Sequence, residues 1–167
     1  QTYGFSRWPG HDSRLWQQLL EEARQRRDEG LQNVKVRFYG FDSDGGVLAR
    51  AEENARRAGV AALIRFERRP LEQLQRPEGA ERGLLVTNPP YGERLKEADL
   101  DGLYTMMGER LKHQYAGSEA WIISSALESM KHIGLKPAVK IDLLNGALKC
   151  KFNKYELFLG RRLKNNE

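Results

Sequence analysis

The feature that most constrains the fold is a short uncharged run, residues 83–87, that leads directly into Asn88-Pro89-Pro90. Such a compact apolar run is typical of a strand buried on both faces of a parallel sheet. The prolines end the strand because they lack an amide donor and fix φ, so Asn88 is expected at its carboxyl end. A sheet of this kind needs helices over its faces, which favours an α/β fold.

Helix and strand patterns alternate along the rest of the chain. Apolar residues at helical spacing predict helices over 13–29, 46–58, 100–115 and 126–131. Further β-rich runs predict strands over 35–41, 63–67, 120–124, 139–144 and 148–159. Asn145-Gly146 predicts a two-residue hairpin between the last two, because both positions of a type I′ turn favour positive φ. This order predicts a doubly wound sheet with a terminal antiparallel hairpin.

Composition narrows the classes of function. The 167 residues are 40% hydrophobic and 31% charged, which suits one globular domain. No run approaches the ~18 apolar residues of a transmembrane helix, so we expect no membrane association. Cys150 is the one cysteine and the three histidines show no ligand spacing, so we expect no metal site. A net charge of +5 permits an anionic partner such as nucleic acid.

The segment from Asn88 to Tyr91 carries the most distinctive chemistry. An amide oxygen and backbone carbonyls at a rigid strand end can hold the N–H groups of an exocyclic amine on a planar base. Held in this way, the amine nitrogen becomes more tetrahedral, and the charge that develops on attack is stabilised. The ring of Tyr91 can stack on the base. The alternative is a proline-rich loop with a packing tyrosine.

Asp42 is a second candidate site residue, because it stands at the end of the strand predicted over 35–41. A carboxylate at the carboxyl end of a strand can accept hydrogen bonds from two ribose hydroxyls. The alternative is a turn or helix-capping aspartate.

These motifs together resemble a known family. Asn88-Pro89-Pro90-Tyr91 resembles the signature of amino-group methyltransferases that use S-adenosylmethionine. Its extension, Gly92-Glu93-Arg94-Leu95, is similar to the THUMP-associated, RlmL-type guanine-N2 methyltransferases of 23S ribosomal RNA (UPF0020). Further similarity lies in Gly4–Trp8 with His11-Asp12, in Phe38–Asp44, and in the Asn145-Gly146 hairpin. The resemblance covers nearly the whole chain.

The resemblance implies a class-I, Rossmann-like methyltransferase fold with S-adenosylmethionine as cofactor and 23S ribosomal RNA as partner, in the cytoplasm. Asn88 and Pro89 would accept from the target amine and Tyr91 would stack on the base. Asp42 and Asn88 would contact the cofactor, Asp42 through the ribose hydroxyls. The product would be a guanine methylated on its exocyclic N2.

The sequence departs from the family in two places. The glycine turn of the first cofactor motif and the upstream THUMP domain do not occur in residues 1–167, so we expect a partial catalytic domain. The strand of that motif would lie between those ending at Asp42 and Asn88, so we expect a gap or a borrowed strand there. Pro70 stands where members carry an acidic residue, which either leaves recognition of the cofactor's adenine to backbone groups or weakens it.

Two other functions remain open: methylation of adenine N6 in DNA or RNA, and an inactive fragment that serves only RNA binding or assembly. The sequence leaves the target nucleotide and the oligomeric state open. Phosphate contacts are predicted, with a solvated surface as the alternative, for six cations: Arg65, Arg68, Arg69, Lys149, Lys151 and Lys154.

Overall fold

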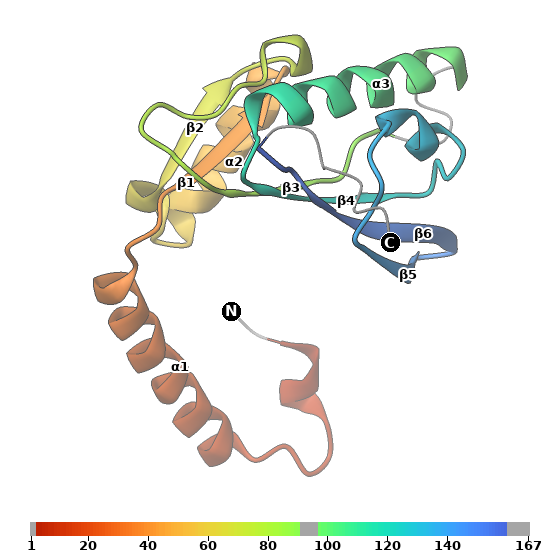
Figure 1. The fold of residues 1–167 in the computed structure, drawn as a ribbon. Helices are drawn as coiled ribbons and strands as arrows, with labels where there is room; N and C mark the ends of the chain where they lie inside the picture. Colours follow the sequence, from red (N-terminus) through yellow and green to blue (C-terminus); the bar gives the residue numbers. More distant parts are fainter. Residues whose placement is uncertain (1–2, 91–96, 160–167) are drawn as a thin grey trace, which may run out of the picture. The chain divides into compact units, whose positions relative to one another are not determined.

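A computed structural model describes residues 3–90 and 97–159 (Figure 1). The chain divides into two compact units, which are described separately. The first contains the residues up to 40 together with 49–66, and the second contains 41–48 together with the residues from 67 onward.

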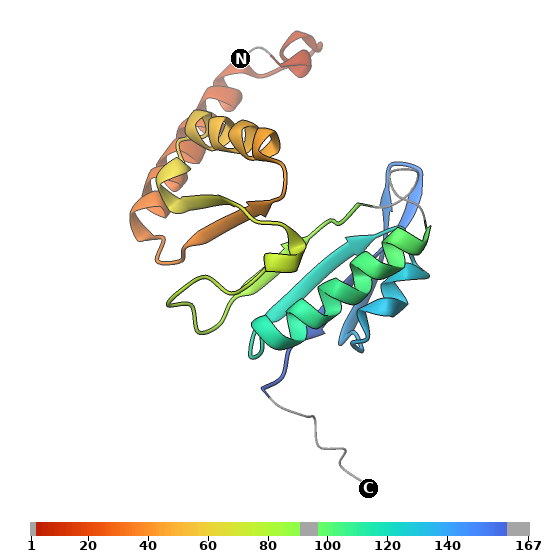
Figure 2. The same cartoon turned by 90° about the horizontal axis from the view of Figure 1, so that it is seen from above.

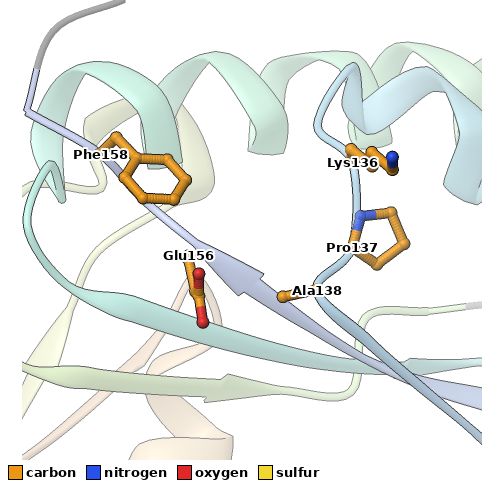
Figure 3. A pocket seen from close by; sticks show the side chains of 5 residues that line it. All are labelled: Lys136, Pro137, Ala138, Glu156 and Phe158. Carbon is orange, nitrogen blue, oxygen red and sulfur yellow. The ribbon is translucent and has the colours of Figure 1, made fainter. Parts of the chain in front are cut away.

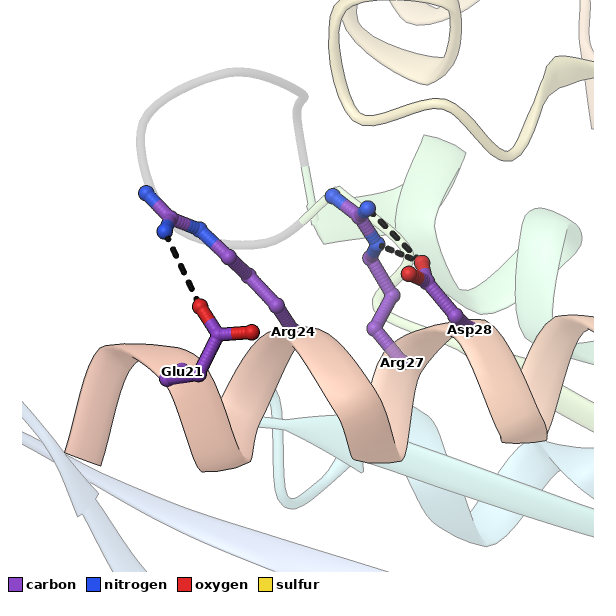
Figure 4. A network of polar contacts seen from close by, with 4 residues as sticks. All are labelled: Glu21, Arg24, Arg27 and Asp28. Atoms are coloured by element: carbon purple, nitrogen blue, oxygen red, sulfur yellow. Dashed lines mark hydrogen bonds and ion pairs between the residues drawn. The ribbon is translucent and has the colours of Figure 1, made fainter. Parts of the chain in front are cut away.

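The first unit begins with the 3₁₀ turn Gly4–Arg7 and the helix α1 (Ser13–Asn33). The Asp12 carboxylate caps α1 by accepting from the amides of Arg14 and Leu15, both at 2.9 Å. None of the 21 residues of α1 is buried. Figure 4 shows two of its local ion pairs, Glu21 with Arg24 and Arg27 with Asp28, on this exposed surface.

The strands β1 (Phe38–Asp42) and β2 (Ile64–Arg68) pair in a two-stranded sheet, and the helix α2 (Gly45–Arg57) connects them. Gly40 of β1 lies directly against the ring of Phe66: a Cβ at Gly40 would stand 2.6 Å from the Cδ1 of Phe66. Only a residue without a side chain permits this close approach.

The second unit contains a four-stranded sheet in the order β3-β4-β6-β5. Its strands are β3 (Leu84–Thr87), β4 (Glu119–Ser124), β5 (Val139–Asn145) and β6 (Leu148–Glu156). The strand β3 pairs with β4 in parallel, and β6 is antiparallel to both β4 and β5. The strands β3, β4 and β5 therefore run in one direction, and their carboxyl ends lie at the same edge of the sheet.

The core of this unit lies on one face of the sheet, beneath the helix α3 (Glu97–Gln114) and the 3₁₀ helix η5 (Ser129–Ile133), as Figure 1 shows. Its most completely buried side chains are Tyr104, Leu111, Ile122, Ile133 and Tyr155. The sequence pattern placed a core helix at 100–115, and the structure confirms it. The terminal hairpin is also confirmed, but its two-residue turn is Gly146-Ala147 rather than Asn145-Gly146, because Asn145 ends β5 opposite Leu148. Gly146 has a φ of 61°, but no described residue other than glycine has a positive φ, so the prediction of a type I′ turn is wrong.

Two expectations about the sheet meet different outcomes. The strand at 83–87 is present, but the prediction that it is buried is wrong: Leu84 is 64% and Val86 62% exposed. The reason is that the core lies on one face of the sheet: Leu85 packs against it, whereas Leu84 and Val86 point to the opposite face. The expected interruption agrees with the two separate sheets found in the described ranges. Whether a gap or a borrowed strand lies between β1 and β3 stays a prediction.

Candidate functional site

Asn88 follows β3 at the edge where the parallel strands end, one position beyond the pair Thr87–Ile122. The residue is exposed, whereas Pro89 after it is buried and anchors the turn. In the part of the chain that the structure describes, no hydrogen bond engages the Asn88 side chain. Its amide oxygen is therefore available to accept from a ligand, and its expected role toward the target amine stays a prediction.

Asp42 ends β1 and is half-buried. Its Oδ1 accepts from the amide of Asp44 at 2.8 Å, which forms a local turn. Asp44 is the residue that caps α2, because its Oδ1 accepts from the amides of Gly46 (2.7 Å) and Val47 (3.3 Å). The helix-capping alternative for Asp42 is thus excluded, whereas the alternative of a turn aspartate is confirmed for its Oδ1. Its Oδ2 has no hydrogen bond within the described residues and is free to accept from hydroxyls.

Two predicted phosphate contacts instead hold the backbone beside Asp42. The guanidinium of Arg69 lies 4.6 Å from the centre of the Phe41 ring and pairs with Glu67 at 2.7 Å. Only 11% of the Arg69 side chain is exposed. Arg68 donates from Nε to the carbonyl of Ser43 at 2.9 Å. Arg69 is structural here, because the Gln75 carbonyl and the Glu67 carboxylate take its donors. Arg68 is exposed and uses Nε alone, so its phosphate contact stays a prediction.

The lysines of β6 differ in whether an ion pair engages them. Lys154 pairs with Glu119 at 2.8 Å, and this hydrogen bond raises the pKa of the Lys154 ammonium. Lys151 pairs with a carboxylate across the hairpin at 2.7 Å. Lys149 and Arg65 are exposed and have no ion pair or hydrogen bond in the described ranges. Of the predicted cations, these two therefore suit phosphate best.

A shallow pocket is lined by Lys136, Pro137, Ala138, Glu156 and Phe158 (Figure 3). Glu156 is the register partner of Glu119, the first residue of β4. The pocket therefore lies at the end of the sheet opposite to Asn88. Nothing in the sequence singled it out, and it plays no part in the candidate site.

The structure does not bring all of the predicted residues together. Asp42 ends a strand of one sheet and Asn88 follows a strand of the other, and no hydrogen bond joins their side chains in the described residues. Tyr91 and the motif from Gly92 to Leu95 lie outside the described residues, so their expected roles stay predictions. No helix of the described ranges could cross a membrane. Those ranges also hold no cluster of three or more acidic, histidine or cysteine side chains arranged for a metal.

The arrangement is that of a class-I, Rossmann-like methyltransferase. The structure of SMU.472 complexed with SAH matches it with a TM-score of 0.78 and 27% identity, over 96% of this chain and 41% of that one. A "possible methylase" from Clostridium difficile 630 matches with a TM-score of 0.80 and 29% identity, over 97% and 42% of the two chains.

This chain belongs to the RMKL-like methyltransferase domain family (UPF0020), whose family model matches residues 2–154. The family uses S-adenosylmethionine, as the sequence predicted. Curated relatives named "Ribosomal RNA large subunit methyltransferase K/L" are 46% identical in Syntrophotalea carbinolica and 40% identical in Marinobacter nauticus. The matches cover 93% and 94% of this chain but 22% of each relative, so the chain spans about a fifth of their length.

A further solved structure carries a different description. It is "a predicted N6-adenine-specific DNA methylase from Listeria monocytogenes str. 4b F2365", 29% identical with a TM-score of 0.61, over 71% of this chain and 30% of that one. That description names adenine in DNA as the target, whereas the names of the ribosomal RNA relatives specify no base.

Proposed function

We propose that the protein containing this chain transfers a methyl group from S-adenosylmethionine to the exocyclic N2 of a guanine in 23S ribosomal RNA, in the cytoplasm. The observation that carries this proposal is the exposed Asn88 amide on a buried Pro89 anchor, at the carboxyl edge of the parallel strands. Ligands bind at this edge in open α/β sheets. The rRNA methyltransferase names of the relatives support the choice of substrate.

The roles of the residues follow from the chemistry of an aryl amine, whose lone pair is delocalised into the base. The Asn88 side-chain oxygen and the Pro89 carbonyl would accept from the two N–H groups, which localises the lone pair for attack. They would also stabilise the positive charge on nitrogen until a proton leaves to solvent. Tyr91 would stack on the base. The base must leave its helical stack to reach this point.

Asp42 fits the ribose of the cofactor. Its free Oδ2 can accept from a hydroxyl, while its Oδ1 holds the turn with Asp44. When bound, S-adenosylmethionine supplies an electrophilic methyl group on a sulfonium. The glycine turn expected to hold the amino-acid end of the cofactor does not occur in this sequence, so we assign that part of the site to residues outside it. Residues 1–167 would then form the carboxyl-terminal part of a catalytic domain. In the complete protein, a THUMP domain would precede that catalytic domain.

Substitution of Asn88 in the complete protein tests this proposal. Asn88→Ala is expected to abolish methyl transfer in a tritiated-methyl assay on ribosomal RNA and to leave cofactor affinity largely in place. Asn33→Ala is a matched control, because Asn33 is an exposed asparagine at the end of α1. Unchanged turnover by Asn88→Ala would refute the proposed role.

Methylation of adenine N6 is the second candidate, favoured by the description of the Listeria monocytogenes structure. The acceptors at Asn88 and Pro89 recognise an amine rather than a particular base. Mapping the methylated nucleotides of ribosomal RNA from a deletion strain would separate the two, since loss of an N2-methylguanine supports the first. An inactive fragment is the third reading; micromolar binding of S-adenosylmethionine by residues 1–167 alone, measured by calorimetry, would refute it.

A further inference from the structure

The hairpin of β5 and β6 extends past the strand beside it. Ser124, the last residue of β4, is the register partner of Lys151, and three more cross-strand pairs follow before the turn. At ~3.3 Å per residue these pairs project about 10 Å beyond β4. Because β3, β4 and β5 run in the same direction, the projection stands at the edge of the sheet that carries Asn88. Figure 2 shows the hairpin extending past the end of β4.

Two side chains stand opposite each other near the tip of this projection. Leu144 and Lys149 are cross-strand partners, and the leucine is 74% exposed. Lys149 is exposed and has no partner within the described residues. The next pair inward on the same face differs, because Lys151 and Asp142 neutralise each other at 2.7 Å and the lysine lowers the pKa of the Asp142 carboxyl. The tip thus presents an apolar side chain beside a free cation.

Resting on the function proposed above, we propose that the Leu144–Lys149 pair binds the RNA strand next to the target nucleotide. The Lys149 ammonium would contact a backbone phosphate. Leu144 would pack against the base left without a stacking neighbour when the target base leaves the helix.

The requirements of an extruded base support this assignment. Removing one base from a stack exposes the faces of its neighbours at a cost of a few kcal/mol. Proteins that open base steps in DNA commonly place an apolar side chain in the gap. A lysine beside that side chain can hold the flanking phosphate. An exposed leucine with an unpaired lysine, at the edge where the target amine must arrive, combines these two functions.

Three variants of the complete protein test the proposal. Lys149→Ala is expected to weaken binding to ribosomal RNA by roughly fivefold and to reduce the slope of log K against log salt by about one. Leu144→Ala is expected to lower turnover by about tenfold while cofactor affinity stays unchanged. Lys140→Ala is the matched control: Lys140 is an exposed lysine on the same face of β5, without a partner in the described ranges, at the strand end away from the tip. Its RNA affinity should stay within about twofold of wild type.

The outcomes are separable. Wild-type methylation of RNA, with Leu144→Ala and Lys149→Ala matching wild type in affinity and turnover, would overturn this proposal and leave the proposed function intact. Failure of the wild-type protein to methylate any RNA would instead refute the proposed function. Loss of cofactor binding or of folding in both variants would show that another part of the protein, not RNA, covers the tip.

Discussion

The hydroxyl groups of Tyr104 and Ser124 lie 2.6 Å apart, and neither side chain is exposed to solvent. Tyr104 belongs to α3 and Ser124 ends β4, so the bond fixes the helix to the carboxyl edge of the sheet. The Ser124 Oγ also accepts from the amide of Ala126 at 2.9 Å, which starts the loop beyond the strand. The edge that carries Asn88 is therefore held from beneath by a buried polar contact.

Tyr104→Phe is expected to destabilise the protein by about 1–2 kcal/mol, because Ser124 loses a buried hydrogen-bond partner. Ser124→Ala should cost more, since it also removes the acceptor of the Ala126 amide. Urea unfolding of both variants and of the double variant measures the coupling between the two hydroxyls. Additive effects of the two substitutions would show that the hydroxyl contact contributes nothing.

Gly108→Ala should destabilise the second unit by about 1–3 kcal/mol through overpacking. A Cβ at Gly108 would stand 1.9 Å from the carbonyl oxygen of Ile133, so α3 could not stay in place against η5. Gly102→Ala on the same helix is the control, because nothing lies within 4 Å of that position. It should stabilise the helix by roughly 0.5–1 kcal/mol. Thermal unfolding of the two variants should therefore shift in opposite directions.

Asp42→Asn is expected to weaken S-adenosylmethionine binding by the complete protein about tenfold, because an amide accepts ribose hydroxyls less strongly than a carboxylate. The asparagine keeps an oxygen for the turn with Asp44, so stability should change little. Asp44→Ala provides the contrast: it should cost about 1 kcal/mol of stability through loss of the α2 cap. Equal cofactor affinity of Asp42→Asn and wild type, measured by calorimetry, would contradict the assignment.

Alkaline pH should destabilise the protein through two buried phenols. Burial raises the pKa of both Tyr115 and Tyr155 above the ordinary value of 10.0. A raised folded-state pKa means that the unfolded state releases the proton first, so stability is present below about pH 10 and is lost as pH rises through the folded value. Unfolding curves collected between about pH 8 and about pH 12, on both sides of the phenol pKa, should show this loss of stability. Tyr155→Phe should flatten it.

The features that the sequence predicted well depend on local backbone requirements. The hairpin between β5 and β6 needs a turn residue that tolerates positive φ, and Gly146 supplies it with a φ of 61°. The end of β3 follows from the two prolines. Each of these requirements is satisfied within a few residues, so the local sequence is enough to detect it.

The features that the sequence missed depend on what lies alongside a segment. The apolar sequence of β3 does not reveal that one face of the strand, which carries Leu84, is exposed to solvent. Asp42 and Asp44 are two residues apart, and only the geometry shows that Asp44 caps α2. Arg69 looks like a phosphate contact in the sequence, but its donors are used by Glu67 and by the chain around it.

The exposure of α1 determines how readily this helix unfolds locally. A helix without buried side chains is stabilised mainly by its cap, its backbone hydrogen bonds and its surface ion pairs, to which α1 adds the aromatic contacts of Trp16 with Tyr3 and Phe5. Its amide hydrogens should therefore exchange with deuterium from local fraying, at rates close to those of an isolated peptide helix. The amides of β4 and the buried turns of α3 should exchange only when the core itself unfolds. The amides of one chain would thus exchange in two well-separated ranges of rate.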